Sequence, residues 1–450
     1  MSNVPDDTER GVPPEAVSGP AMQTRPAPAA AEGIDPSTLT STVPVTGAAR
    51  QRLIVSMLVA NVFLFATYAG VIAILLPQQL ALLDDANKIT NLAIVTGTSS
   101  FFTLFAQPVV GAFSDRTRAR LGRRSPWLII GGVGGGVLTI VLQFAPNVFW
   151  ITAVWVAAQV LLNAFQGPLA AVIADRVSRD GRATASAFAG AGTAIGGTIG
   201  IVVAGQLLAQ LGVAYAVFGL GIIVVSVLFV LVNRDGDSRL LQVGRFSWVA
   251  FAKSFWVSPR KHPDYAWAFA GRFVMILGYQ GVQAYQFYIL TDRLGLAPAE
   301  AGGIAGVLAL VSMVTLVVST LVFGRISDKL GRRKVFVFAA SVVMAVGIAI
   351  PLFVPTVPAM IVYSLIVGLG YGAYMAVDVA LMIDVLPSQG DAGKDLGVLN
   401  VATNIPQAIT PLVAATLLGI FAGDYASIFG FAALMVLLSS VLVFPIKSVR

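Results

Sequence analysis

The 450-residue sequence contains no cysteine and only one histidine, His262. Without cysteine, the chain cannot form disulfides, thiolate metal sites or a cysteine nucleophile. His262 stands alone in a polar stretch, so imidazole catalysis and histidine-based metal sites are not expected either. The sequence offers no nucleophile–base pair, metal-ligand cluster or phosphate-binding loop. It therefore predicts neither an enzyme nor a protein with a cofactor or a metal site.

Charged residues are also scarce. They make up 11% of the chain, while hydrophobic residues make up 57%; a soluble globular protein has about 25% charged residues. A chain of this kind cannot cover itself with a polar surface, so we expect a lipid bilayer to surround it. Apolar stretches of the roughly 20 residues that a membrane helix needs follow one another between residues 53 and 445. We predict an all-α membrane protein with twelve transmembrane helices.

One long polar stretch divides these helices into two sets of six. It mixes aromatic residues such as Trp248 with basic residues such as Lys253, which is typical of a helix lying on the membrane surface. The residues before the first helix are rich in Pro, Ala, Thr and Ser and have no apolar period. The predicted regions are a disordered cytoplasmic tail (1–48), a first six-helix bundle (49–232), a cytoplasmic linker with an interfacial helix (233–264) and a second six-helix bundle (265–450).

The distribution of lysine and arginine predicts the orientation. With the N-terminus inside, only Lys88 and Arg293 lie in outer loops and only Arg272 lies within a helix. This is the asymmetry of the positive-inside rule, and it predicts a multi-pass protein of the cytoplasmic (inner) membrane with both termini inside. Topology thus accounts for the excess of 29 basic over 22 acidic residues, so no nucleic-acid partner is expected. We expect a monomer.

An internal repeat supports the division into two halves. The letters GAFSDR (111–116) and LGRR (121–124) follow the second predicted helix, and GRISDKLGRR (324–333) follows the eighth. The aspartates of the two copies, at 115 and 328, are 213 residues apart, and the aspartates ending the fourth and tenth helices, at 175 and 384, are 209 apart. Two matches at nearly one offset indicate duplication of a six-helix unit.

This pattern in both halves resembles the loop signature of the major facilitator superfamily. The resemblance implies two pseudo-symmetric six-helix bundles and transport by alternating access. In that superfamily the motif holds the cytoplasmic gate shut, which implies a gating role for its charged residues. In this chain they are Asp115, Arg116, Arg123, Asp328 and Arg332. The alternative is that these charges only anchor the topology.

Three further stretches narrow the resemblance. The letters GRRSPW (122–127), QGP (166–168) with AD (174–175), and GVLN (397–400) with IPQ (405–407) are similar to patterns of the sucrose:proton symporters and the related glycoside–pentoside–hexuronide:cation symporters. Ala170 replaces an arginine of the sucrose pattern, which argues against sucrose itself. The second helix lacks the carboxylates of the sodium-coupled branch, so we expect protons as the coupling ion.

Polar side chains recur at helical spacing on several of the predicted helices. Sugar recognition needs hydrogen-bonding groups and aromatic faces converging on a cavity, and the superfamily resemblance makes helices 1, 4, 7 and 10 the cavity helices. The candidate solute-binding residues are Asn61, Tyr68, Gln159, Asn163, Gln166, Tyr279, Gln283, Tyr371, Tyr374, Asn400 and Asn404. The alternative is that these stripes join helices to one another, which is the interpretation we favour for the stripe of Thr96, Ser100, Thr103 and Gln107.

Two ionisable residues fall inside predicted spans, where charge is costly and marks function. Arg272 and Asp378 each lie six or seven residues from the cytoplasmic end of a helix, or roughly 9–11 Å deep at 1.5 Å per residue. They can therefore meet, and we predict that Asp378 carries the coupling proton with Arg272 as its partner. The alternative is a permanent structural ion pair, or an arginine that snorkels to the interface.

The residues thus predict a secondary transporter that moves a small solute, a sugar or glycoside, by proton-coupled symport. The alternative function is an efflux pump for an amphipathic small molecule. Such a pump is expected to present a wide apolar pocket rich in methionine, whereas this chain offers glutamine, asparagine and tyrosine.

Overall fold

The computed structural model describes residues 44–239, 260, 262–330, 333–384 and 392–446; at residues 328, 330, 379–380, 383–384 and 392–401 only the course of the backbone is described. Residues 1–43 of the predicted tail (1–48) and residues 240–259 of the predicted linker (233–264) lie outside the described residues. Every described element is helical. The first half contains α2 (Gly47–Gly70), η1 (Val71–Leu75), α3 (Leu76–Leu83), α4 (Lys88–Arg116), α5 (Ser125–Val141), α6 (Val148–Arg176), α7 (Arg182–Gln206) and α8 (Leu211–Val232). The second half contains α10 (Pro263–Ala284), α11 (Gln286–Tyr288), η5 (Ile289–Arg293), α12 (Pro298–Leu330), α13 (Arg333–Phe353), α14 (Val357–Asp384), α15 (Ala392–Ile420) and α16 (Ala426–Leu442).

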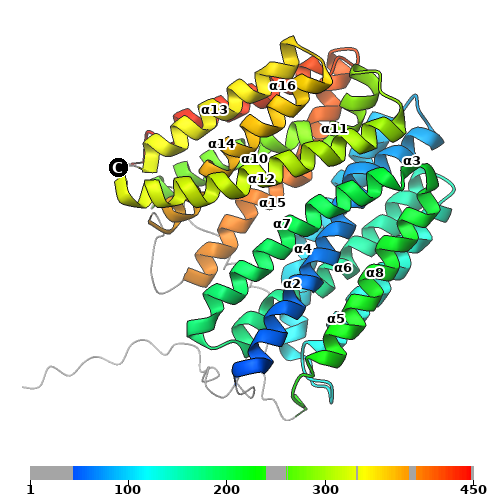
Figure 1. Cartoon of the computed structure of the whole chain (residues 1–450), viewed down its shortest axis with the longest axis vertical. Helices are drawn as coiled ribbons and strands as arrows, with labels where there is room; N and C mark the ends of the chain where they lie inside the picture. Colours follow the sequence, from blue (N-terminus) through cyan, green and yellow to red (C-terminus); the bar gives the residue numbers. More distant parts are fainter. Residues whose placement is uncertain (1–43, 240–259, 261, 331–332, 385–391, 447–450) are drawn as a thin grey trace, which may run out of the picture.

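The two halves repeat one packing scheme. In the first half α2 packs on α7 and α8, α4 on α6, and α5 on α6 and α8. In the second half α10 packs on α15 and α16, α12 on α14, and α13 on α14 and α16. Each pairing of the first half has its counterpart in the second when helices are matched in chain order. The halves meet through α7 against α12 and α4 against α15, a pair of contacts that a two-fold axis would exchange (Figure 1). This arrangement agrees with the duplication indicated by the sequence repeat.

Glycines allow the closest helix approaches. On α7, three glycines face α2: Gly192, Gly196 and Gly200. A Cβ atom added at any of them would lie only 2.3–2.6 Å from a backbone oxygen of α2. Between the halves, a Cβ at Gly205 would lie 2.3 Å from the carbonyl oxygen of Gly302. Small residues at such crossings let membrane helices pack backbone to backbone. The α7–α12 contact therefore joins the halves through backbone rather than through side chains.

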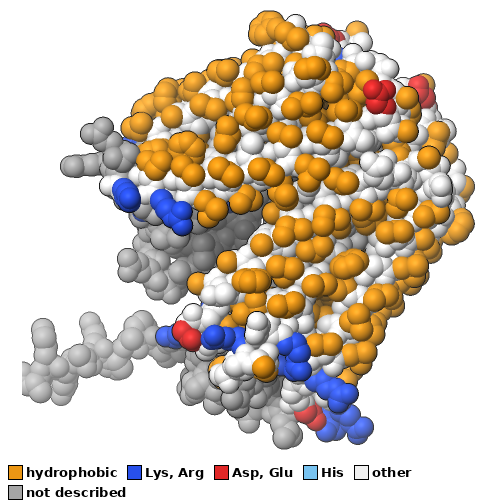
Figure 2. Space-filling model, in the orientation of Figure 1, with side chains coloured by type: hydrophobic (Ala, Val, Ile, Leu, Met, Phe, Trp, Pro, Cys, Tyr) orange, Lys and Arg blue, Asp and Glu red, His pale blue; other side chains and the backbone are white. Residues whose placement is uncertain are grey.

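Ten of the described helical segments are long and apolar enough to cross a membrane. Helix α16 is a shorter apolar helix of 17 residues. Helix α10, with 22 residues, is long enough to cross a membrane but is too polar to be among the ten. The count of twelve spans therefore stays a prediction. Large apolar side chains such as Leu220, Val314 and Leu321 are exposed along the outside of the helices and form a broad hydrophobic surface (Figure 2). This surface suits contact with lipid tails.

The two ends of the molecule differ. We call the end with the loops 117–124 and 233–239 the basic end, because arginine dominates those loops. We call the other end, with residues 84–88 and 289–297, the closed end, because the halves touch there through α3 and α11. Figure 1 shows the halves diverging from the closed end towards the basic end. The described parts of the halves are thus in contact at the closed end and farther apart at the basic end.

Candidate functional site

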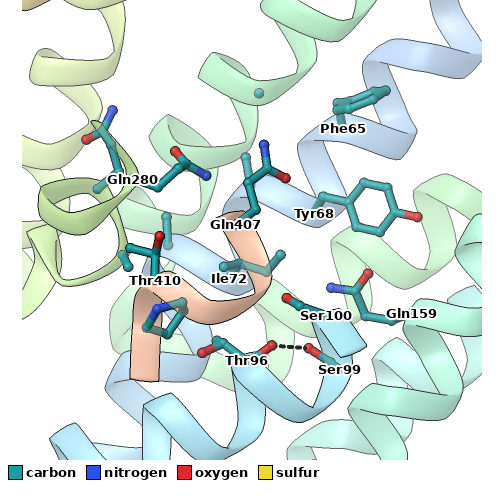
Figure 3. Close-up of a pocket in the computed structure, with 16 residues that line it drawn as sticks. Phe65, Tyr68, Ile72, Thr96, Ser99, Ser100, Gln159, Gln280, Gln407 and Thr410 are labelled. Carbon is teal, nitrogen blue, oxygen red and sulfur yellow. Dashed lines mark hydrogen bonds between the residues drawn. The ribbon is translucent and has the colours of Figure 1, made fainter. Parts of the chain in front are cut away.

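A cavity of about 360 Å³ lies between the halves, where α2, α4, α6 and α7 face α10 and α15 (Figure 3). A second part of about 280 Å³ extends it between α2, α4, α6 and α15. Both parts are lined by Phe65, Tyr68, Ile72, Ser100, Gln159 and Gln407. Because these residues are shared, we treat the two parts as one central cavity.

The walls of the central cavity are polar but uncharged. Among the described residues, its lining consists of amides, hydroxyls and apolar groups and includes no Asp, Glu, Lys or Arg. Two of the residues that line it, Tyr68 and Gln283, each have a buried polar atom without a hydrogen-bond partner among the described residues, the Tyr68 hydroxyl and the Gln283 amide oxygen. An unpaired buried polar group costs about 1–3 kcal/mol. Phe65 and Tyr68, whose rings pack edge to face with centroids 5.8 Å apart, add an aromatic wall. The cavity thus favours a neutral ligand that forms hydrogen bonds.

Six predicted solute-binding residues line this cavity: Tyr68, Gln159, Asn163, Gln166, Gln283 and Asn404. Asn61 does not, because its amide donates to the Met57 carbonyl at 2.8 Å and its Cβ faces Gly192 of α7. Tyr279, Tyr371 and Tyr374 of the second half are not among the residues that line it. For Asn400 only the backbone is described. Solute binding by any of these residues stays a prediction.

The stripe on α4 was misinterpreted as a packing surface. Thr96 and Ser100 line the first part of the cavity, and Thr103 and Gln107 line the second. Helical spacing shows which residues share a face but does not show whether that face meets another helix or open space. Sequence reasoning also missed Phe65, Gln280 and Thr410 as lining residues. Phe65 and Thr410 belonged to no predicted stripe, whereas Gln280 lies next to Tyr279 on a helix already singled out.

Arg272 and Asp378 form an ion pair, as expected from their similar predicted depths in the membrane. The Arg272 guanidinium lies 3.1 Å from the Asp378 carboxylate and also donates from Nε to the Thr403 hydroxyl of α15 at 3.1 Å. Asp378 is 3% exposed. The pair does not line the central cavity; with Tyr374 and Ser439 it borders a small void of about 10 Å³ inside the second half. Its role in coupling stays a prediction.

A stack of two tyrosines joins α10 and α14, the two helices that carry this ion pair. The rings of Tyr279 on α10 and Tyr371 on α14 are 4.1 Å apart between centroids and inclined by only 6°. The Gln283 amide donates to the Tyr279 hydroxyl at 3.1 Å. One face of α10 and one face of α14 are thus in contact from the cavity wall towards the ion pair.

At the basic end, Arg124 is the centre of a cluster of charges. Its guanidinium lies 2.6 Å from Asp115 and 2.8 Å from Asp175, and Arg123 lies 2.5 Å from Asp175. Burial disfavours the charge of Arg124, but its hydrogen bonds to and attraction by Asp175 and Asp115 outweigh burial and raise the pKa of the guanidinium. The cluster ties the end of α4 to the end of α6 and the start of α5.

The gating prediction named Arg123 but missed Arg124, the adjacent arginine of the same motif. Arg116 lies at the end of α4, where it donates to the Ala112 carbonyl at 3.0 Å. In the second copy of the motif, Asp328 lies on α12 with only its backbone described, and Arg332 lies outside the described residues. Gating by all five predicted residues stays a prediction.

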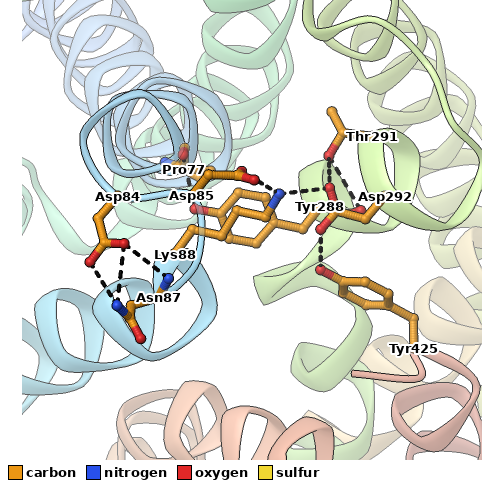
Figure 4. A network of polar contacts seen from close by, with 9 residues as sticks. All are labelled: Pro77, Asp84, Asp85, Asn87, Lys88, Tyr288, Thr291, Asp292 and Tyr425. Carbon is orange, nitrogen blue, oxygen red and sulfur yellow. Dashed lines mark hydrogen bonds and ion pairs between the residues drawn. The ribbon is translucent and has the colours of Figure 1, made fainter. Parts of the chain in front are cut away.

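At the closed end a polar network crosses between the halves (Figure 4). Lys88 contacts Asp85 of its own half at 2.8 Å and Asp292 of the other half at 2.9 Å. Asp292 also accepts from the Tyr425 hydroxyl at 2.7 Å. The Tyr288 hydroxyl donates across the interface to the Pro77 carbonyl at 2.9 Å. Beside this network, a hydrogen bond from the Asn87 side chain holds the pKa of Asp84 below its usual value.

Two related helical halves with a cavity between them are the architecture of a membrane carrier. Residues 57–322 and 288–449 match the sequence pattern of the Major Facilitator Superfamily. The chain belongs to this superfamily, and it is a transporter rather than an enzyme.

Individual relatives are more distant. Over 98 residues the chain is 31% identical to the sucrose transport protein SUC4 of Arabidopsis thaliana, a match that spans 18% of this chain and only 19% of that protein. Over 368 residues it is 22% identical to the fujikurins efflux protein of Gibberella fujikuroi, covering 79% of this chain and 73% of that protein. The solved structure of a D-xylose–proton symporter has the same fold, with a TM-score of 0.64 at 13% identity over 89% of this chain and 98% of the other.

Proposed function

We propose that this transporter carries a sugar or glycoside across the cytoplasmic membrane by proton-coupled symport. The observation that carries the proposal is the uncharged, hydrogen-bonding lining of the central cavity, which includes Tyr68 and Gln283, each with an unpaired polar atom. Amides both donate and accept, as sugar hydroxyls do. Phe65 and Tyr68 supply ring surface for the C–H faces of a sugar. An ionic solute would instead favour a countercharge in the lining.

The size of the cavity agrees with this class of solute. Small-molecule pockets have volumes of about 300–1,000 Å³, and the first part of the cavity alone has about 360 Å³. Similarity to the sucrose transport protein SUC4 over 98 residues supports the same class. Because neither observation distinguishes one sugar from another, several mono- and disaccharides are tested.

We assign the basic end to the cytoplasm, because loops rich in Lys and Arg face the cytoplasm in membrane proteins. Both termini then lie inside, and the arrangement described above is the inward-facing one, with the network of Lys88 and Asp292 closing the outer side. We place the coupling proton on Asp378. Protonation neutralises the carboxylate, weakens its attraction to Arg272 and so biases the carrier between its two states.

The proposal is tested with the purified protein reconstituted into lipid vesicles. Uptake of radiolabelled mono- and disaccharides is measured with and without an imposed pH gradient. We expect at least one sugar to accumulate above its external concentration only when the gradient is present. Accumulation that is independent of the pH gradient would contradict proton coupling, and the absence of any sugar uptake would contradict the substrate class.

The second candidate is efflux of an amphipathic small molecule. The similarity to the fujikurins efflux protein over 79% of this chain favours it. The two candidates differ in direction: a symporter with this function accumulates its solute in cells, whereas an efflux pump lowers the internal level of its substrate. Expression in cells that lack sugar uptake and are sensitive to amphipathic drugs, scored for growth on sugars and for drug resistance, separates the two.

A further inference from the structure

We infer that the stack of Tyr279 on Tyr371 couples the solute to the proton, by transmitting the state of Gln283 in the cavity to the Arg272–Asp378 pair. The inference rests on the proposed function. It concerns the step that makes a carrier a symporter, namely that the solute site and the proton site respond to each other. In this structure the two sites are separate, so something must connect them.

The first contact is at the cavity wall. Gln283 gives one amide hydrogen to the Tyr279 hydroxyl at 3.1 Å, while its amide oxygen has no partner. A solute hydroxyl that binds this amide competes with Tyr279 for Gln283 or reorients the amide. The hydrogen bond that holds the Tyr279 side chain in place thus depends on whether the cavity is occupied.

The second contact is the stack itself. With 4.1 Å between centroids and 6° between planes, the two rings lie flat against each other across the interface of α10 and α14. A lateral or tilting movement of one ring breaks the overlap unless the other follows. Movement of Tyr279 is therefore transmitted to Tyr371 and so to α14.

The third step of the proposed connection runs along α14, from Tyr371 to Asp378. Tyr371, Tyr374 and Asp378 are spaced i, i+3 and i+7 and share one face of the helix. Tyr374 is 1% exposed and Asp378 3% exposed, and both line the same small void. Rotation or sliding of α14 at Tyr371 therefore shifts the Asp378 carboxylate against Arg272, which is itself held to α15 through Thr403.

The surroundings of Asp378 leave Arg272 as its controlling charge. Among the described residues that border the void beside the pair, α10 contributes Arg272, α13 contributes Val337, and α16 contributes Ser439 as its polar group. Tyr374 is the neighbouring titratable group on α14 itself. Among the described residues that border this void, no second ion offsets a small change in the Arg272–Asp378 distance, and the affinity of Asp378 for a proton depends on that distance.

The test separates solute movement from proton movement. In vesicles of purified full-length protein, we would measure counterflow exchange of the accumulated sugar, its accumulation ratio under an imposed pH gradient, and proton uptake evoked by the sugar. The variants are Tyr371→Leu and Tyr279→Leu, which remove the stack, and Tyr279→Phe, which keeps the ring and removes the hydroxyl. The control is Tyr363→Leu, which removes a buried ring of α14 that packs edge to face on Phe429 outside the stack.

Tyr279 and Tyr371 do not line the cavity, so the coupling role that we infer for them does not include contact with the solute. We therefore expect the two stack-removing variants to keep counterflow within about twofold of wild type and to lose about tenfold or more in accumulation ratio and evoked proton uptake, as the loss of a typical coupling free energy gives. Tyr279→Phe should show an intermediate loss, and Tyr363→Leu none beyond its effect on counterflow. Accumulation preserved in both stack variants overturns the inference. So does a parallel fall of counterflow and accumulation, which indicates a structural role only. A wild-type protein that exchanges sugar without moving protons overturns both the inference and the proposed coupling.

Discussion

Lys88 of the first half lies 2.9 Å from Asp292 of the second half, and this ion pair crosses the closed end of the cavity. Both side chains are partly shielded from solvent, at 15% and 26% exposed. Lys88 is also held by Asp85, and Asp292 by Tyr425. The pair thus belongs to a network rather than to an isolated surface contact.

We predict that Asp292→Asn opens the closed end. Because the natural chain contains no cysteine, a single Ser100→Cys substitution places a unique thiol in the cavity wall. Loss of a partly exposed ion pair of about 1 kcal/mol should raise the rate of labelling from the outer side about two- to fivefold. The control is Asp424→Asn, since Asp424 pairs with Arg293 within the second half. Equal labelling rates in the two variants would show that the Lys88–Asp292 pair does not hold this end shut.

The crossing of α7 and α12 makes a second prediction about the same end. Gly205→Ala introduces a Cβ atom 2.3 Å from the Gly302 carbonyl oxygen, so the helices must separate, and overpacking of this kind costs about 1–3 kcal/mol. We expect a lower Tm of the purified protein and faster outer labelling of the Ser100→Cys thiol. The matched control is Gly190→Ala on the same helix, where an added Cβ meets nothing within 4 Å. A Tm as high as that of the control would rule out the close contact.

The cluster at the basic end makes a prediction about turnover. Arg124→Gln removes the guanidinium that contacts both Asp115 and Asp175, whereas the contact of Arg123 with Asp175 remains. We expect kcat for sugar transport to fall about tenfold, since charge-assisted contacts to buried arginine are strong, and KM to stay within about twofold. Arg239→Gln serves as the control because Arg239 and Asp237 form an exposed pair. Loss of affinity with unchanged turnover would place Arg124 in solute binding instead of in the movement between states.

The cavity lining makes a prediction about affinity. Gln283→Ala or Asn163→Ala should raise KM for the transported sugar about tenfold, the effect of losing roughly 1.4 kcal/mol of hydrogen bonding. The Tm should change little, because both side chains face the cavity. Gln210→Ala, at an exposed glutamine, is the control. Unchanged KM in both cavity variants would remove these residues from the solute site.

Charged residues are rare in this apolar sequence, so their positions could be used to predict the duplication of the helices and the Arg272–Asp378 contact. Asp115 and Asp328 stand out against their apolar surroundings and reveal the duplication that the matched helix packing of the halves displays. The depths of Arg272 and Asp378 follow from counting residues from the helix ends, and the two side chains meet at 3.1 Å.

The partner of a polar face could not be predicted in the same way. The stripes on α4 and α6 look alike in sequence, and both line the cavity, whereas Asn61 on α2 faces α7. Neighbouring arginines were equally ambiguous: Arg124 contacts two carboxylates and Arg123 one. The helical period shows which residues share one face of a helix. The packing of all the helices together decides whether that face meets another helix or the cavity.

A proton on Asp378 is proposed to drive solute accumulation. Wild type and Asp378→Asn are compared in vesicles, for sugar accumulation under an imposed pH gradient and for downhill counterflow exchange. Asparagine mimics the protonated carboxyl and cannot release a proton. We expect Asp378→Asn to exchange sugar but no longer to accumulate it, while the exposed control Asp237→Asn does both. Accumulation by Asp378→Asn at the wild-type ratio would show that Asp378 does not carry the coupling proton and that the Arg272–Asp378 pair is a structural contact.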